Sequence, residues 1–369
     1  MSSDSRQEFF NDILKSIGTL EMEVILLTHV IPAHSDFILA LKKVAKIACI
    51  IAIPYSVDKR YSRELSHDHP VSTPRLSELN DHAFLLNQIR DHIGPDSRFA
   101  IMEIGGYYAS VLNQLAEEFG DRLVGVVEDT EAGHRRYEKC EVLPCPVISI
   151  ARSSLKIAED FQIGPACIFS SEKLVKEVGL SLNNRRALVL GYGRVGHGLA
   201  YELRNRGLEV TIYDIDPIRR IVAQSEGFLV PDRATALRET EVIFGASGNT
   251  SISEEDFELL TDGVILASCS SRDVEFDAQW LLNQCDWGVP VPNVKKFNLN
   301  GKSVYLLADG RPINFLDGGG LGPVLCLVQA ELLHSLRALS EVVLPSRLTE
   351  LDEGARKSIA SNWLNYFCS

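Results

Sequence analysis

Short runs of apolar and β-branched residues recur along the chain and alternate with stretches of helical pattern. Runs in which apolar residues follow one another almost continuously are typical of parallel strands that helices cover on both faces. The sequence therefore predicts the α/β class, with two doubly wound parallel-sheet domains. The runs that carry this prediction are residues 23–29, 45–55, 98–106, 122–129, 146–151, 186–191, 209–214, 241–247 and 263–270.

The length of 369 residues is enough for two domains. Residues 164–182 have a helical pattern that ends at the turn pair Asn183 and Asn184, and we expect this helix to join the domains. The predicted organisation is a substrate and catalytic domain over residues 1–165, completed by an apolar helix in about 321–345, a Rossmann domain over 166–320, and a C-terminal tail over 346–369.

The charge and hydropathy of the chain exclude several kinds of partner. Acidic residues outnumber basic ones by 50 to 37, and no block of Lys or Arg could neutralise a nucleic-acid backbone. The N-terminus is polar and acidic, and no apolar run approaches the roughly 18 residues of a membrane span. We therefore expect a soluble cytoplasmic protein that binds a small molecule rather than nucleic acid or a membrane.

The eight cysteines are scattered, without the pattern of a disulfide framework. Cys140 and Cys145 have no second Cys/His pair to complete a zinc site, and His67-Asp68-His69 has no further ligands nearby. We predict no metal.

One glycine motif predicts a dinucleotide site. The strand over 186–191 leads into Gly191, Gly193 and Gly196, a helix follows, and the next strand ends at Asp214. The first glycine allows a tight turn, the second lets a pyrophosphate approach backbone N–H groups at a helix N-terminus, and the third lets the helix pack closely. A carboxylate at Asp214 would accept hydrogen bonds from the ribose and repel a 2′-phosphate, so we expect NAD rather than NADP.

The stretch from Gly191 to Val230, then GASGNTSISEEDF and VILASCSSRDVEFDAQWL, resembles the cofactor domain of S-adenosylhomocysteine hydrolases. The segments LLTHVIPAHSDFILAL, MEIGG and GVVEDTEAG extend the resemblance towards the N-terminus. In that family, tightly held NAD oxidises the 3′-hydroxyl of the substrate ribose, which permits elimination and water addition at C5′ before the ketone is reduced again. The resemblance implies NAD as the cofactor, held by Gly191, Gly193, Arg194, Val195, Gly196, Asp214, Ser247, Gly248, Asn249, Ser270 and Asn314.

The same resemblance implies a catalytic group. His29 matches the histidine that assists departure and entry at C5′, and Lys156 and Asp160 match the lysine and aspartate that contact the ribose hydroxyls. Glu103 and Asp129 close predicted strands and match two of the family's acidic residues. They could form a carboxylate pair for proton transfer or ribose binding, or they could have ordinary helix-capping or salt-bridge roles. Lys156 is expected to act as the general base or hydrogen-bond partner, with Asp160 orienting it, whereas by spacing alone the two could form an ordinary surface ion pair.

Several positions depart from the family. Ile31 and Ala33 replace a threonine and a glutamate that contact the ribose, and Ser270-Ser271 replaces a Gly-His pair. Residues 316–323 replace a Gly-His-Pro loop, and Gly318-Gly319-Gly320 within them could form either a hinge or an anion-binding loop. The C-terminal residues have no counterpart of the family tail that carries a lysine and a tyrosine into a partner subunit.

These features together predict a divergent, NAD-dependent enzyme of this family. It would oxidise a secondary hydroxyl of a small polar substrate, nucleoside-like molecules included, with or without return of the hydride. The alternatives are a simple NAD-dependent dehydrogenase and an NAD-binding pseudoenzyme with a regulatory, partner-binding role. By resemblance, the expected assembly is a homodimer or homotetramer. His34, on the helix after His29, is expected at the surface.

Overall fold

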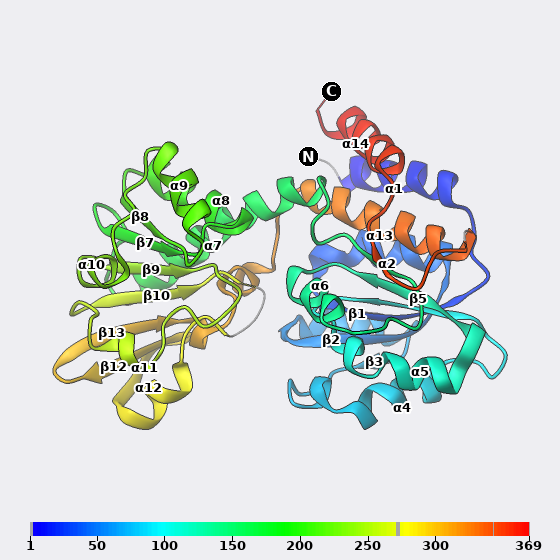
Figure 1. Cartoon of the computed structure of the whole chain (residues 1–369), viewed down its shortest axis with the longest axis horizontal. Helices are drawn as coiled ribbons and strands as arrows, with labels where there is room; N and C mark the ends of the chain where they lie inside the picture. The colour runs from blue at the N-terminus through cyan, green and yellow to red at the C-terminus, as the bar shows by residue number, and fades with distance from the viewer. Residues whose placement is uncertain (1–2, 271–273, 342, 369) are drawn as a thin grey trace. The chain divides into compact units, whose positions relative to one another are not determined.

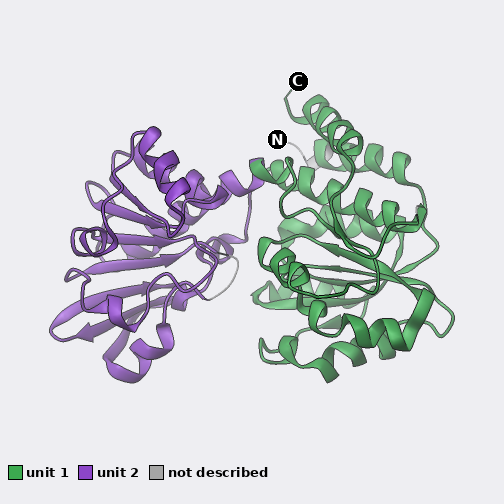
Figure 2. Cartoon of the chain, in the orientation of Figure 1, with its two compact units in different colours: residues 1–157, 322–369 green, residues 158–321 purple. Residues whose placement is uncertain are grey.

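The computed structural model describes residues 3–270, 274–341 and 343–368, with side chains from residue 5 onward. The chain forms two compact units, residues 1–157 with 322–369 and residues 158–321 (Figure 2). Each unit is built on a sheet with helices on both faces (Figure 1). Both units combine largely parallel strands with helices, which confirms the predicted α/β class.

Unit 1 contains a parallel sheet in the order β14-β6-β5-β4-β1-β2-β3. One core lies between this sheet and α1, α2, α13 and α14, and a second core lies on the side of α4 and α5. The strands are β1 (Glu23–Val30), β2 (Lys46–Val57), β3 (Val71–Ser72), β4 (Phe99–Glu103), β5 (Leu123–Glu128), β6 (Val147–Ser149) and β14 (Leu348–Thr349). The helices are α1 (Ser3–Ile17), α2 (Ser35–Val44), α3 (Lys59–Leu65), α4 (His82–His92), α5 (Leu112–Phe119), α6 (Glu131–Glu138), α13 (Val324–Glu341) and α14 (Glu353–Phe367).

Unit 2 contains a mixed sheet in the order β11-β12-β13-β10-β9-β7-β8. Strands β8, β7, β9, β10 and β13 are parallel, whereas β11 and β12 pair antiparallel at one edge, which the sequence did not predict. The strands are β7 (Arg186–Leu190), β8 (Glu209–Tyr213), β9 (Val242–Gly245), β10 (Val264–Ser268), β11 (Asp286–Val291), β12 (Val294–Leu299) and β13 (Lys302–Leu307). The helices are α7 (Lys156–Glu177), α8 (Arg194–Asn205), α9 (Pro217–Ser225), α10 (Arg233–Arg238), α11 (Glu254–Phe257) and α12 (Ala278–Gln284).

Helix α7 begins before the predicted start at Gly164 and continues through Pro165. Gly164 is needed for packing rather than for a helix start, because a Cβ there would lie 2.4 Å from the backbone nitrogen of Leu199 in α8. A Cβ on Gly198 would likewise lie 2.3 Å from the carbonyl oxygen of Phe161. These two glycines let α7 and α8 cross closely.

Residues 346–369, predicted as a tail, add β14 and α14 to unit 1. Helix α14 packs on α1, where the ring of Phe9 lies 5.6 Å from Phe367 and the hydroxyl of Tyr366 donates to Asp12. The indole N–H of Trp363 donates to the carbonyl oxygen of Pro323 at 2.8 Å, which ties α14 to the start of α13.

Candidate functional site

The glycine loop of unit 2 connects β7 to α8, and two of its glycines are required by close packing. Gly191 has a φ of +97°, and a Cβ there would lie 2.7 Å from the carbonyl oxygen of Ala246. A Cβ on Gly196 would lie 1.9 Å from the carbonyl oxygen of Gly191. Gly193 leaves the loop backbone open, because only the Arg219 guanidinium would approach its Cβ, at 3.5 Å. This open backbone before a helix N-terminus fits the pyrophosphate of a dinucleotide.

Asp214 follows β8, and its side chain binds the backbone of the glycine loop. Its carboxylate accepts hydrogen bonds from the backbone N–H groups of Tyr192 at 2.6 Å and Asp216 at 2.8 Å, and its side chain is only 4% exposed. The Arg219 guanidinium lies 3.6 Å from the same carboxylate. Asp214 therefore shapes the loop, and its contact with a ribose remains a prediction.

The other predicted cofactor residues of unit 2 lie around the carboxyl ends of β9 and β10. Ser247 and Gly248 follow β9 and bind the carboxylate of Glu275, while Ser270 follows β10 and is buried. Ser271, the second residue of the replaced Gly-His pair, is outside the described residues. The remaining predicted positions are Arg194 and Val195 at the start of α8, Asn249 in the loop after β9, and the buried Asn314 before α13.

In unit 1, a polar cluster lies at the carboxyl ends of β1 and β5 and at the start of α7. The ammonium of Lys156 lies 2.5 Å from the carboxylate of Asp129, and Lys156 is only 8% exposed. The ring of His29 packs edge-on against His34 at 5.8 Å and shares a hydrogen bond with the hydroxyl of Ser56. Parallel strands bring these residues to one sheet edge, which is where α/β proteins build their sites.

Both histidines of the cluster are neutral at pH 7. Burial lowers the pKa of His29 well below its ordinary value, and the neighbouring His34 and Lys156 lower it further. Burial also lowers the pKa of His34 to about 4, with Asp129 opposing the shift and Lys156 adding to it. A neutral imidazole beside an ammonium–carboxylate pair can accept a proton from a bound hydroxyl.

One prediction about this cluster needs correction. His34, expected at the surface, is half-buried against His29 because the short helical turn over 32–34 folds it back, with its ring nitrogen 3.4 Å from the Thr28 hydroxyl. Lys156 pairs with Asp129, and Asp160 lies 3.5 Å from Arg194; that Asp160 orients Lys156 stays a prediction. Asp160 therefore contacts the first residue of α8, next to the glycine loop of its own unit.

Glu103 does not form the predicted pair with Asp129. Strand register places Glu103 opposite Glu128, and both carboxyls are buried. Glu103 accepts hydrogen bonds from Tyr137 and from the backbone of Tyr108, while Glu128 accepts from the N–H groups of Gly105 and Gly106. Burial raises the pKa of Glu103 to about 7 and that of Glu128 well above its ordinary value. The pair thus fixes the loop after β4 rather than facing a ligand.

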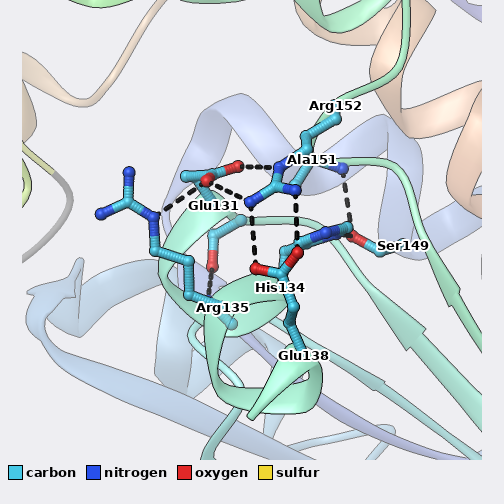
Figure 3. A network of polar contacts seen from close by, with 9 residues as sticks. Glu131, His134, Arg135, Glu138, Ser149, Ala151 and Arg152 are labelled. Atoms are coloured by element: carbon cyan, nitrogen blue, oxygen red, sulfur yellow. Dashed lines mark hydrogen bonds and ion pairs between the residues drawn. The ribbon is translucent and has the colours of Figure 1, made fainter. Parts of the chain in front are cut away.

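An ion-pair network braces the turn that leads into Lys156 (Figure 3). Arg152 donates to Glu131 at 2.9 Å and to Glu138 at 3.2 Å, so the turn after β6 is held against α6. His134 of α6 and Ser149 of β6 share a hydrogen bond of 2.9 Å. These contacts hold the turn between β6 and α7, and they therefore help to position Lys156, the first residue of α7.

Sequence reasoning missed two buried carboxyls, Glu331 and Glu275. Glu331 of α13 is fully buried, and burial raises its pKa to about 7, with Ser153, Arg356 and Lys156 opposing the rise. The only sequence signal for each was an acidic residue inside an apolar stretch. Glu331 lies in LVQAELL, and Glu275 lies in VEFD.

The described residues contain no cluster of three His, Cys, Asp or Glu side chains that could hold a metal. Asp68, in the middle of His67-Asp68-His69, instead pairs with Lys42. In the same described part of the chain, no helix has the length and apolar character to cross a membrane.

Comparisons with known proteins agree with this geometry. Residues 172–320 match the family described as S-adenosyl-L-homocysteine hydrolase, NAD binding domain. The chain is 31% identical over 229 residues to an adenosylhomocysteinase of Pyrococcus abyssi, a match that covers 60% of this chain and 53% of that protein. It is 30% identical over 247 residues to an S-inosyl-L-homocysteine hydrolase of Methanopyrus kandleri, covering 65% of this chain and 57% of that one.

The chain thus spans little more than half the length of these relatives. Among solved structures, a glyoxylate reductase from Paecilomyes thermophila overlaps with a TM-score of 0.47 at 13% identity, covering 90% of this chain and 99% of that one. The family match confirms the predicted resemblance and the predicted cofactor, NAD. Residues 172–320 are an NAD-binding domain, and the chain is similar to S-adenosyl-L-homocysteine hydrolases over 60% to 65% of its length.

Proposed function

We propose that this protein is an NAD-dependent enzyme that oxidises a secondary hydroxyl of a small, polar, nucleoside-like substrate. The observation that carries the proposal is the buried Lys156–Asp129 pair beside two neutral histidines at the carboxyl edge of the unit 1 sheet. A buried ion pair contributes little to stability on balance, so its presence at a sheet edge favours a chemical role. The proposal assigns the substrate to unit 1 and the cofactor to unit 2.

The chemistry needs a group that takes the hydroxyl proton as the carbonyl forms, within about 3 Å of that oxygen. Asp129 holds the Lys156 ammonium in place, so that Lys156 can bind the substrate oxygen. His29, whose ring is oriented by Ser56, is a neutral base that can accept the proton. NAD, when bound, supplies the hydride acceptor.

We infer the substrate class from the relatives and from the positions at which this chain differs from them. The relatives are named for adenosyl- and S-inosyl-homocysteine substrates, which supports a substrate that carries a ribose hydroxyl. Ile31 is buried and apolar where the family has a ribose contact, so we infer a substrate with a different pattern of ribose or base contacts. Whether the hydride returns decides between a hydrolase or lyase and a dehydrogenase.

The redox state of the nicotinamide tests the proposal. We would determine whether NAD co-purifies and exchanges, and then mix the protein with nucleosides, S-adenosyl- and S-inosyl-homocysteine, and 2-hydroxy acids while recording the absorbance of reduced nicotinamide. A tightly retained, partly reduced cofactor indicates internal redox cycling. If no compound changes the redox state, the regulatory, partner-binding alternative becomes the better one. Light scattering tests the expected homodimer or homotetramer.

Replacing Lys156 by Met tests the assignment within the cluster. We expect NAD affinity to stay nearly unchanged and hydride transfer to fall at least about 100-fold, the usual cost of removing a group that binds the reacting oxygen. The matched control is Lys173→Met, because Lys173 also lies on α7 and pairs with a carboxylate, Asp317 at 2.7 Å, but is largely exposed. Equal loss in both variants, or no loss in Lys156→Met, contradicts the assignment.

A further inference from the structure

Glu275 lies between β10 and α12 and is fully buried. Its carboxylate accepts a hydrogen bond from the Gly248 N–H at 2.6 Å and one from the Ser247 hydroxyl at 2.9 Å. The hydroxyl of Ser270 also binds it, while the Ser251 hydroxyl donates to the backbone carbonyl oxygen of Glu275 at 3.1 Å. One carboxylate thus joins the loop after β9 to the residue that follows β10.

The strand end beside Glu275 is shaped to receive the carboxylate. A Cβ on Gly245, the last residue of β9, would lie 2.8 Å from a carboxylate oxygen of Glu275. The same loop packs directly on the glycine loop, since Ala246 lies where a Gly191 side chain would be and its N–H donates to the Leu190 carbonyl oxygen at 2.8 Å. Displacing Glu275 would therefore move the loop that flanks the dinucleotide motif.

The charge of Glu275 is not matched by a cation among the described residues that hydrogen-bond to it. Among the described residues, the donors to its carboxylate are two hydroxyls and one backbone N–H, all neutral. Burial raises the pKa of Glu275 above its ordinary value, and these donors offset only part of the rise. When this carboxylate is ionised, its negative charge acts strongly on its surroundings, because few solvent dipoles screen it.

We propose that Glu275 has two roles towards the nicotinamide of bound NAD: it positions the loop of residues 246–251, and its charge favours the positively charged oxidised ring over the neutral reduced ring. In open α/β sheets of this kind, the loops after these strands border the bound dinucleotide. Glu275 is a positioning residue, and no chemical step passes through it. The proposal rests on the NAD-dependent function above and adds a device that keeps the resting cofactor oxidised.

The test is the affinity of the full chain for NAD⁺ and for NADH, measured by calorimetry for the wild type and for Glu275→Gln. We expect the Kd for NAD⁺ to rise about tenfold in the variant. The Kd for NADH should rise by a factor that is at least about three times smaller, because only NAD⁺ carries the positive ring. Asp256→Asn is the matched control, since Asp256 is another buried carboxyl of unit 2 but pairs with Arg233 at 2.6 Å. It should lower the thermal stability of unit 2 without changing the ratio of the two affinities.

Equal weakening of NAD⁺ and NADH in Glu275→Gln would overturn the charge role, and unchanged affinities would overturn both roles. A ratio that changes equally in Asp256→Asn would overturn the assignment to Glu275. A wild type that binds neither nucleotide would instead remove the proposed NAD-dependent function, so the two failures are distinguishable.

Discussion

Glu331 provides a quantitative prediction about stability. Its carboxyl lies fully buried in α13, and its pKa is raised from 4.5 to about 7. The folded protein therefore binds this proton more tightly than the unfolded chain does. The resulting stability is fully present below about pH 4.5 and is lost as the pH rises through about 7.

The magnitude follows from the pKa shift. Each pKa unit corresponds to about 1.4 kcal/mol, so the free energy of unfolding should fall by roughly 2–3 kcal/mol between about pH 5 and pH 8 on account of this group. Glu331→Gln keeps the shape of the side chain and removes the ionisation. We therefore expect the variant to match the wild type near pH 5 and to exceed its stability by this amount near pH 8.

Urea unfolding of the two proteins across this pH range is the assay. Trp363 reports on unit 1, because its indole N–H is bound at the α13–α14 contact, whereas the other tryptophans, Trp280 and Trp287, lie in unit 2 and can be replaced by Phe. Taking the difference between wild type and variant at each pH cancels the titration of His29 and His34. A difference that stays constant from pH 5 to pH 8 would refute the reasoning about buried charge.

Three further predictions concern the cofactor and the substrate. Asp214→Ala should weaken NAD binding and reduce discrimination against NADP, as measured by calorimetry; equal affinity of the wild type for both nucleotides would contradict the preference. Gly196→Ala should destabilise unit 2 by about 1–3 kcal/mol, because the methyl group would lie 1.9 Å from the Gly191 carbonyl oxygen, and thermal unfolding that is unchanged would contradict this packing argument. Hydrolysis of S-adenosylhomocysteine should be weak or absent, because each lost hydrogen bond to a charged group removes about 1.5–3 kcal/mol; turnover at about 1–1000 per second would show that the departures do not matter.

Much of the fold could be predicted because parallel strands have a strong sequence signal. Each of the nine apolar runs contains a strand, and the strand ends mark the polar clusters of both units. The strands β11 and β12 were not predicted, since β11 is largely exposed and β12 alternates buried and exposed residues at a sheet edge. The strands β3 and β14, with two residues each, are too short to have a periodic pattern.

The candidate site was only partly predictable for a different reason. The sequence indicated that Lys156 and Asp129 lie at strand ends, but the partner of an ammonium depends on strand order and on rotation about α7, which spacing alone does not determine. The role of Glu103 was missed because register places it opposite Glu128 and not Asp129. Glu275 contacts the loop after β9 although it lies more than 20 residues further along the chain. No local sequence pattern indicates such a long-range contact.

Unit 1 is formed by two separate stretches of the chain, which affects how the protein folds during synthesis. Unit 2 is a continuous stretch, residues 158–321, so it can fold as soon as that stretch has left the ribosome. One of the two cores of unit 1 instead requires α13 and α14, so the nascent protein must keep the apolar faces of α1 and α2 uncovered until residues 324–367 have been made. We therefore expect a messenger cut short just before codon 324 to yield a chain whose unit 2 resists protease, while its N-terminal portion depends on chaperones.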